Sequence, residues 1–303
     1  MLKVLVTGGA GFIGSHLVDE LIAKGAKVYV IDNLSAGKLS NLNEKAELYD
    51  IDICHPKIKS LIKDLKPDAL FHLAAQADVG KSVENPIEDA RVNIDGTINL
   101  LQSCVGSSVR KFIFSSTSAV YGNIQRDMIT ENERTVPSSF YGLSKLSAES
   151  YIRIFHDLFG LQYTILRYAN VYGPRQLPKG DGGVVSVFLD RLKKGEPITI
   201  HGDGEQTRDF IFVKDVVAAN IAAVDKADHQ TLHISTGKSI SINDLLERIS
   251  EIHKLPITKE IAPSRVGDIR HSCLSNQLAK DYLKWQPSIS ISEGLYHAYN
   301  QAT

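Results

Sequence analysis

The sequence predicts an α/β protein built on an open parallel β-sheet with helices on both faces. Over the first 170 residues, apolar runs rich in β-branched residues alternate with segments of helical periodicity, which is typical of strand–helix–strand units. The first of these runs leads directly into a glycine-rich turn and a helix. Beyond residue 170 the elements are shorter and the loops are rich in glycine and proline, so we expect a smaller second α/β lobe.

The glycine turn is the strongest single signal. Met1–Thr7 is an apolar, β-branched run typical of a buried parallel strand, and Ser15–Lys24 has apolar residues at helical spacing. Between them, Gly8 permits a tight turn, Gly11 lets the backbone approach a pyrophosphate, and Gly14 lets the helix pack closely on the strand. The helix N-terminus then offers free N–H groups to phosphates. This pattern predicts a doubly wound, Rossmann-type dinucleotide site.

The second strand, Lys27–Ile31, ends in an acidic residue. Asp32 follows Gly14 at close to the spacing of roughly 20 residues expected of the carboxylate that binds a ribose 2′-OH. A carboxylate there repels a 2′-phosphate, so we expect NAD rather than NADP as the cofactor.

The remaining elements follow in alternation. Strands are expected at Glu47–Asp52, Asp68–Ala74, Arg110–Phe114, Gln162–Arg167, Pro197–His201 and Phe210–Val213. Helices are expected at Ile58–Leu65, Ser82–Gln102, Ser144–Phe159, Val184–Lys194, Val216–Val224, Ile242–His253, Asn276–Leu283 and Ile291–Asn300. We expect a sheet domain at 1–170 and a substrate-binding lobe at 171–303, partly interleaved with it. Ligands of such sheets bind beyond the carboxyl ends of the strands.

Two further features, one at a strand end and one in a helix, have alternative interpretations. Asp52 and Ile53 either flank an adenine or form a solvated strand end. Asn93 lies inside a helical stretch, where an amide is usually exposed or structural.

Composition excludes several classes of protein. The chain has 303 residues, of which 43% are hydrophobic and 23% charged, and its net charge is −1. These values are ordinary for a globular enzyme, and the net charge shows no excess of positive charge of the kind that binds nucleic acid or an acidic membrane. The three cysteines form no CxxC pair and the histidines lack zinc-type spacing, so we expect reduced thiols, a cytoplasmic location and no metal site. No apolar run is long enough to span a bilayer.

The second informative stretch predicts a catalytic group. Tyr141 and Lys145 are four residues apart at the start of a helix and share one face. A phenol is a poor base at neutral pH, and a neighbouring ammonium favours its phenolate. Thr117, at the end of a strand, supplies a hydroxyl group for the same substrate oxygen. An ordinary exposed Tyr–Lys pair is the alternative, which the upstream dinucleotide pattern disfavours.

With these motifs the chain resembles the extended short-chain dehydrogenase/reductases. The resemblance covers essentially the whole chain and is greatest to the sugar-nucleotide branch and its UDP-glucose 4-epimerases. The motifs that carry it are Thr7–Gly14 (TGGAGFIG), Asp32–Ser35 (DNLS), His72–Gln76 (HLAAQ), Phe114–Gly122 (FSSTSAVYG), Tyr141–Lys145 (YGLSK), Leu166–Gly173 (LRYANVYG) and Gly202–Phe210 (GDG…RDF).

The resemblance assigns roles to particular residues. It implies Thr117 as the catalytic hydroxyl, Tyr141 as the base and Lys145 as its partner. The residues at NAD-contacting positions are Gly8, Gly11, Phe12, Ile13, Gly14, Asp32, Asn33, Asp52, Ile53, Ala74, Ala75, Gln76, Asn93, Ser115, Tyr141, Lys145 and Tyr168. Those at nucleotide-sugar positions are Thr117, Asn170, Val184, Arg208, Arg265 and Asp268. It also implies a homodimer formed by the helices around residues 84–102 and 144–159.

Guanidinium groups suit a diphosphate, which supports the assignment of the two arginines. An ion pair between Arg208 and Asp209 is the alternative for the first of them.

Local residues separate the reactions of this branch. Related 4,6-dehydratases have an Asp-Glu pair directly after the catalytic threonine, and decarboxylases usually have a glutamate at the second position. Here Ser118 and Ala119 follow Thr117, so elimination and decarboxylation are disfavoured. The resemblance then implies oxidation and re-reduction at C4 of a UDP-hexose through a transient 4-keto sugar, with Tyr141 taking the hydroxyl proton and NAD staying bound.

The identity of the sugar depends on fewer residues. By resemblance, Ser272 or Cys273 matches the position that tunes sugar size in the C4-epimerases. Either residue is small enough to leave room for an N-acetyl group, so N-acetylated hexoses are expected as substrates in addition to glucose and galactose. UDP-glucuronate 4-epimerase is an alternative function, because Arg175 could pair with a C6 carboxylate. A nucleotide-sugar 4-keto reductase and a non-catalytic NAD-binding sensor are further alternatives.

Overall fold

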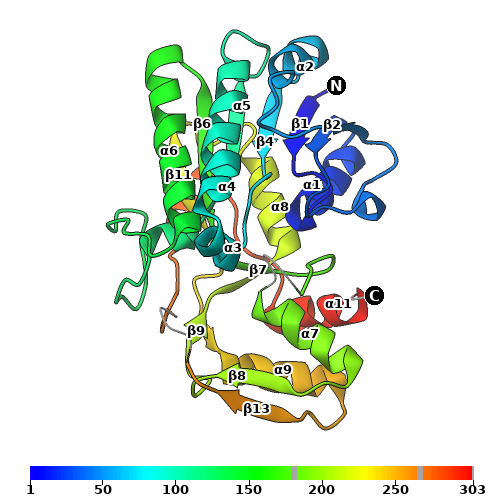
Figure 1. The fold of residues 1–303 in the computed structure, drawn as a ribbon, viewed down its shortest axis with the longest axis vertical. Coiled ribbons are helices and arrows are strands. Elements are labelled where there is room, and N and C mark those ends of the chain that lie inside the picture. The colour runs from blue at the N-terminus through cyan, green and yellow to red at the C-terminus, as the bar shows by residue number, and fades with distance from the viewer. Residues whose placement is uncertain (179–182, 265–268, 302–303) are drawn as a thin grey trace.

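The fold is organised around a seven-stranded parallel sheet (Figure 1). The computed structural model describes residues 1–178, 183–264 and 269–301. The strand order is β11-β6-β5-β4-β1-β2-β3, and every neighbouring pair is parallel. The strands are β1 (Lys3–Thr7), β2 (Lys27–Asp32), β3 (Glu47–Asp50), β4 (Ala69–His72), β5 (Lys111–Thr117), β6 (Gln162–Tyr168) and β11 (Gln230–Ile234).

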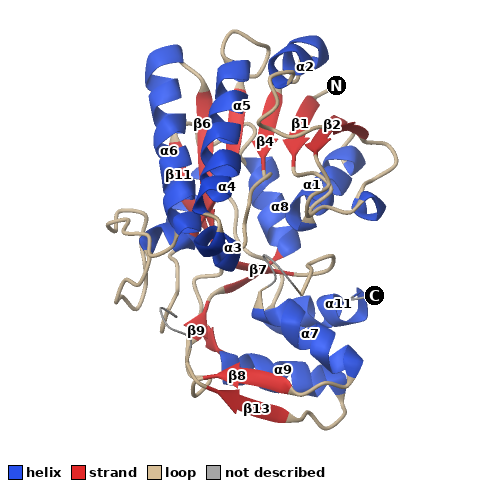
Figure 2. Ribbon diagram, in the orientation of Figure 1, coloured by secondary structure: helices blue, strands red, loops and turns tan. Residues whose placement is uncertain are grey.

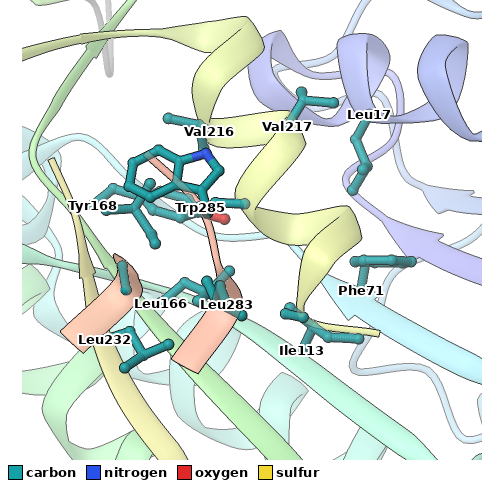
Figure 3. Packing of buried hydrophobic residues seen from close by; sticks show 14 of the residues in the cluster. Leu17, Phe71, Ile113, Leu166, Tyr168, Val216, Val217, Leu232, Leu283 and Trp285 are labelled. Carbon is teal, nitrogen blue, oxygen red and sulfur yellow. The ribbon is translucent and has the colours of Figure 1, made fainter. Parts of the chain in front are cut away.

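Helices cover both faces of this sheet (Figure 2). One face packs against α1 (Phe12–Ala23), α8 (Val213–Ala222) and α10 (Gln277–Leu283), and the other packs against α2 (Ile58–Leu65), α5 (Gly96–Cys104) and α6 (Phe140–Phe159). In the first layer, the ring of Trp285 lies over Val216 and Tyr168 (Figure 3). Burial on both faces explains why the central strands are continuous apolar runs.

The strand order reverses between β1 and β4. Strand β1 pairs with β2 on one edge and with β4 on the opposite edge. The carboxyl ends of all seven strands face the smaller lobe (Figure 1). In an open parallel sheet this reversal creates the crevice where ligands bind, so the fold positions the site between sheet and lobe.

The smaller lobe has its own apolar core. Its helices are α7 (Val184–Lys194), α9 (Ile242–His253) and α11 (Ile291–Gln301). Its strands form three short pairs: β7 (Asn170–Tyr172) with β10 (Phe210–Phe212), β9 (Thr207–Arg208) with β12 (Ile240–Ser241), and β8 (Ile198–His201) with β13 (Lys259–Ala262). No single large sheet holds this lobe together among the described residues.

The doubly wound parallel fold is confirmed, but some element predictions were wrong. The sequence analysis did not predict β11 or β13. The expected helix at Ser82–Gln102 is divided into α3 (Val79–Glu84), α4 (Pro86–Ala90), a π-helical segment η2 (Arg91–Asp95) and α5. The break falls at Asn85, because a residue before proline avoids the helical conformation. The domain boundary near residue 170 stays a prediction, although β11 joins the sheet from beyond it.

Of the helices in the described ranges, none is long and apolar enough to cross a membrane.

Candidate functional site

The glycine turn between β1 and α1 forms a close-packed cradle. Gly8 has φ +72°, a left-handed conformation that favours glycine, and a Cβ there would lie 2.7 Å from the amide nitrogen of Ala74. A Cβ on Gly14 would overlap the carbonyl oxygen of Gly8. Gly11 precedes α1 as its N-cap residue, so Phe12 and Ile13 start the helix. Because only glycines permit this approach of strand, turn and helix, the cradle fits a bound pyrophosphate.

Asp32 ends β2 and is fixed beside this cradle. Its carboxylate accepts hydrogen bonds from the backbone N–H groups of Ala10 and Leu34, both at 2.9 Å. Burial raises the pKa of Asp32 despite these hydrogen bonds. The carboxylate therefore holds the turn in place and lies where a ribose is predicted.

The next strand end completes this side of the site. The amide of Asn33 donates to Asp52 at 3.1 Å, and Arg91 lies 3.4 Å from the same carboxylate oxygen. Burial opposes the charge of Asp52, but hydrogen bonds from Cys54 and the charge of Arg91 lower its pKa. Ile53 is buried against Gly96, where a Cβ would lie 2.6 Å from its Cδ1 atom. Ile53 is thus buried while Asp52 is partly exposed, and their contact with adenine stays a prediction.

The segment after β4 is held by one buried amide. Asn93 accepts a hydrogen bond from the backbone N–H of Gln76 at 2.9 Å and donates to Gln76 O, Asp89 and Ser144. Asn93 is therefore a buried structural amide, not an exposed one. The N–H of Ala74 donates to the hydroxyl of Thr7 at 3.2 Å, so Ala74 and Ala75 lie against the glycine turn.

The first turn of α6, which bears Tyr141, packs against the segment that follows Thr117. Thr117 ends β5 and is the N-cap of the short 3₁₀ helix η3 (Ser118–Tyr121), where its hydroxyl accepts a hydrogen bond from the N–H of Ala119. Gly142 in the first turn of α6 lies so close to η3 that a Cβ would stand 2.6 Å from Ala119 O. A larger residue at position 142 would therefore push the first turn of α6 away from η3.

Lys145 is buried one turn beyond Tyr141. Its side chain is 3% exposed, and its ammonium lies 4.5 Å from the ring centroid of Phe114 in β5. Burial lowers the pKa of Lys145 to about 8, while the carboxylates of Asp89 and Glu149 oppose the shift. The ammonium is thus still largely charged at neutral pH and favours a nearby phenolate.

Ser115 and Tyr168, which are also predicted to lie near NAD, are buried in the protein interior. The two hydroxyl groups are hydrogen-bonded at 2.9 Å, and Tyr168 is tied to Asn220 of α8. Burial raises the pKa of Tyr168 to about 12. Its ring belongs to the core shown in Figure 3, so its predicted contact with NAD would be through the ring edge or backbone.

Three of the predicted nucleotide-sugar residues gather in the smaller lobe. The N–H of Asn170 donates to Asp209 O at 2.9 Å, which places β7 beside the residue that follows Arg208. Val184 is the first residue of α7. Gln176 donates to Val171 O, and its amide lies near Gly183 at the start of α7. Arg265 and Asp268, the other two residues predicted here, lie outside the described residues.

Two further predictions have a structural outcome. Arg208 donates a hydrogen bond to Thr207 O. Asp209 is fully buried, and its carboxylate accepts hydrogen bonds from the backbone N–H groups of Thr236 and Gly237. Arg175 forms an ion pair with Asp19 of α1 at 2.8 Å. Asp19 therefore pairs with one nitrogen of the guanidinium that is the candidate partner of a uronate carboxylate.

Comparison with known proteins identifies the family. The model of the NAD dependent epimerase/dehydratase family matches residues 4–236, well over half of the chain. The chain belongs to this family. As a member of the epimerase/dehydratase family it is an NAD-dependent enzyme, in agreement with the predicted cofactor and with the glycine cradle.

Individual members are similar over almost their whole length. The chain is 41% identical over 300 residues to a putative UDP-glucose 4-epimerase of Methanocaldococcus jannaschii, with 98% of this chain and 97% of the relative covered. It is 44% identical to the solved UDP-glucose 4-epimerase of Thermotoga maritima with UDP-glucose, with a TM-score of 0.97 and coverage of 99% and 98%.

A second solved structure is a UDP-N-acetylglucosamine 4-epimerase of Methanobrevibacter ruminantium in complex with UDP-N-acetylmuramic acid. It is 39% identical, with a TM-score of 0.95 and coverage of 99% and 97%. Together these similarities confirm the predicted fold and the resemblance of this epimerase/dehydratase family member to UDP-sugar 4-epimerases.

Sequence reasoning missed the buried charges that surround the predicted catalytic residues of this family member. Asp89 accepts hydrogen bonds from Gln76 and Asn93 and is buried. Glu149 lies one turn beyond Lys145 and is also buried. The available signal was spacing, because Asp89 precedes Asn93, and Glu149 follows Lys145, by one helical turn.

Proposed function

We propose that the protein interconverts UDP-hexoses by epimerisation at C4, with UDP-glucose and UDP-galactose as substrates. The observation that supports this best is the set of Thr117, Tyr141 and Lys145 at one strand end, with no carboxylate at Ser118 or Ala119. Such a set suits proton removal from a hydroxyl group, while elimination or decarboxylation would need a further acid.

The chemistry follows from the charge of Lys145. The buried ammonium favours the phenolate of Tyr141, which takes the proton of the C4 hydroxyl group, and the Thr117 hydroxyl holds the same substrate oxygen. Bound NAD would accept and return hydride at the adjacent carbon. Inversion at C4 requires that hydride return to the opposite face of the 4-keto sugar, while Tyr141 returns its proton to the C4 oxygen.

The smaller lobe would hold the nucleotide diphosphate. The guanidinium of Arg208 has the forked donor geometry that suits phosphate oxygens, and α7 begins at Val184, so the positive end of this helix lies there. A sugar that is bound through its diphosphate alone is free to turn and present either face.

The proposal extends to N-acetylated sugars because of Ser272. Its N–H donates to Thr207 O at 3.2 Å, which places this small residue next to the strand that bears Arg208. A relative of this chain is a UDP-N-acetylglucosamine 4-epimerase. Interconversion of UDP-GlcNAc and UDP-GalNAc is therefore part of the proposal, while the Arg175–Asp19 ion pair disfavours a uronate.

The test uses protein purified without added cofactor. It is incubated separately with UDP-glucose, UDP-N-acetylglucosamine and UDP-glucuronate, and the sugar signals are followed by proton NMR. We expect galacto-configured products to grow to an equilibrium mixture with the first two sugars and no NAD supplied. No change after addition of NAD would overturn the proposal, and net consumption of reduced cofactor would identify a reductase instead.

We also propose that two copies form a homodimer through α3, α4 and α6. Exposed apolar residues gather on these helices: Val79, Val83, Ile87, Leu143, Tyr151, Ile154 and Leu158. On α6 they recur at helical spacing, which supports a helix-packing face. Light scattering after gel filtration should give a dimer mass for the wild type and a monomer mass for Leu158→Asp. A monomeric wild type would overturn the proposal.

A further inference from the structure

A cluster of buried polar side chains surrounds the strand that carries Thr117. It joins Ser116 of β5, Tyr121 of η3, Glu149 of α6, Arg167 of β6 and His233 of β11, and none of them is more than 4% exposed. Buried polar groups are expensive unless they are paired, so the complete pairing described next is informative.

Glu149 is the centre of the cluster. One carboxylate oxygen accepts hydrogen bonds from the hydroxyl of Ser116 at 2.6 Å and from Arg167 Nε at 2.9 Å. The other accepts from Arg167 Nη2 at 2.6 Å and from Arg153 at 2.9 Å. Burial favours the neutral acid, but the hydrogen bonds and charge of Arg167 outweigh it and hold the pKa of Glu149 below its ordinary value.

Arg167 continues the network to a neutral histidine. Its Nη1 donates to the hydroxyl of Tyr121 at 2.6 Å. His233 Nδ1 faces Ser275 O at 3.0 Å, so this nitrogen must carry the proton, and Nε2 accepts from Tyr121 at 2.6 Å. Burial lowers the pKa of His233 to about 3, which keeps the ring neutral. Each member thus has a defined donor or acceptor role.

The cluster holds the two sides of the predicted catalytic set. Ser116 directly precedes Thr117, and it lies opposite Arg167 in the β5–β6 register. Tyr121 ends the 3₁₀ helix that begins right after Thr117. Glu149 is on the same helix as Tyr141 and Lys145, one turn beyond the lysine. A single carboxylate therefore links the strand end that bears Thr117 to the helix that bears the other two residues.

Stability alone is a weak reason to keep such a pair. Replacing a buried ion pair by apolar residues of similar volume is often neutral or stabilising, whereas hydrogen bonds of fixed direction specify one relative placement of the elements. This favours positioning as the function of the cluster.

We propose that Glu149 is a positioning residue for the reaction, acting through Ser116 to hold Thr117 in register with Tyr141 and Lys145. This inference rests on the proposed C4 epimerisation. Several groups face Lys145: the carboxylates of Glu149 and of Asp89 in α4, His72 of β4 and the Phe114 ring of β5. Loss of the Glu149 charge should therefore change the ionisation of Lys145 as well as its placement.

The first experiment removes the single hydroxyl that joins β5 to Glu149. In Ser116→Ala we expect kcat to fall about tenfold, with KM within twofold and the melting temperature nearly unchanged, because Arg167 remains paired with Glu149. The matched control is Ser150→Ala, an exposed serine next to Glu149 on α6 whose hydroxyl donates only to Leu146 O. The control should keep wild-type kcat.

A readout without turnover separates this proposal from the proposed function. Amide hydrogen exchange should become about tenfold faster at residues 117–121 and 140–145 in Ser116→Ala, and should not change in Ser150→Ala. This comparison holds whatever sugar the enzyme uses. Exchange equal to wild type in both variants would overturn the positioning role, whereas wild-type protein that epimerises no UDP-sugar would overturn only the proposed function.

The second experiment changes Glu149 itself. Glu149→Gln should lower kcat and move the alkaline decline of kcat to lower pH, since the ammonium of Lys145 loses one of its facing carboxylates, and Glu149→Asp should restore part of both. If Glu149→Gln does not fold, Glu149→Leu/Arg167→Met removes both charges at similar volume. A folded double variant with wild-type kcat and an unchanged pH profile would show that the pair is only structural.

Discussion

The end of the large sheet and the smaller lobe are built in opposite ways. Thr117 and Arg167 lie on β5 and β6, which pair with each other over seven positions, and Tyr141 lies on a 20-residue helix packed against them. In contrast, Arg208 lies on a two-residue strand that pairs with another strand of two residues. The predicted catalytic groups are thus on a long strand pairing and a long helix, whereas the groups predicted to hold the nucleotide are on short pairings.

This difference suggests a division of labour. Chemistry needs placement within fractions of an ångström, which buried strands and a long helix provide. Binding of a flexible diphosphate tolerates more movement. We therefore expect substitutions at the sheet end to change mainly kcat, and substitutions in the smaller lobe to change mainly KM.

Tyr141→Phe should give the largest effect. It removes the phenolic oxygen and leaves the ring, so kcat should fall by about 10²- to 10⁴-fold with KM within threefold. NAD measured in the purified variant should equal the wild-type amount, because the glycine cradle is untouched. A variant with more than a tenth of wild-type kcat would show that another group takes the proton.

Arg208→Leu tests the other region. Loss of a charge-assisted hydrogen bond of about 1.5–3 kcal/mol should raise KM by roughly 10- to 100-fold, with kcat within threefold. The matched control is Arg270→Leu, since Arg270 is an exposed arginine of the same lobe that pairs with Asp203. If Arg208→Leu lowered kcat and left KM unchanged, the division between the two regions would be wrong.

The fold of the first region could be predicted because its signals are local. The strands β1, β2, β4, β5 and β6 are apolar runs of adequate length, and the glycine turn has a sequence pattern of its own. In contrast, β11 starts with Gln230 and contains His233, whose ring is hydrogen-bonded to Tyr121 and Ser275, both far away in the chain. The exposed β13, Lys259–Ala262, has no apolar alternation to detect.

The site was predictable to a similar extent. Motifs located the turn, the strand ends and the Tyr–Lys pair, and the parallel sheet brings their carboxyl ends to one edge. The supporting charges were not predictable, because the partners of Glu149 lie at Ser116 and Arg167, on two other elements. Such long-range pairing leaves no periodic pattern in the sequence.

The pH dependence of kcat tests the role of Lys145, which lies at the end of the large sheet. Lys145 favours the Tyr141 phenolate only while it is charged, and burial lowers its pKa to about 8. The charged form is lost as the pH rises through this value, so kcat should decline above about pH 8, by roughly tenfold per pH unit well beyond it. Lys145→Arg stays charged and should lack this decline, whatever its absolute kcat. An identical decline in the arginine variant would assign it to another group.

Ser272→Tyr should give the smallest and most selective effect. Ser272 is buried and its N–H donates to Thr207 O, so a larger side chain would need space beside the strand β9 that bears Thr207 and Arg208. If that space holds the substituent at C2, activity with UDP-N-acetylglucosamine should fall about five- to tenfold relative to UDP-glucose. Ser272→Ala, which keeps the residue small, should leave the ratio of the two activities unchanged. Parallel assays with both sugars give that ratio for each variant. Equal losses with both would mean that position 272 supports the fold of the lobe and does not select the sugar, and the short pairings of the lobe would then account for the loss.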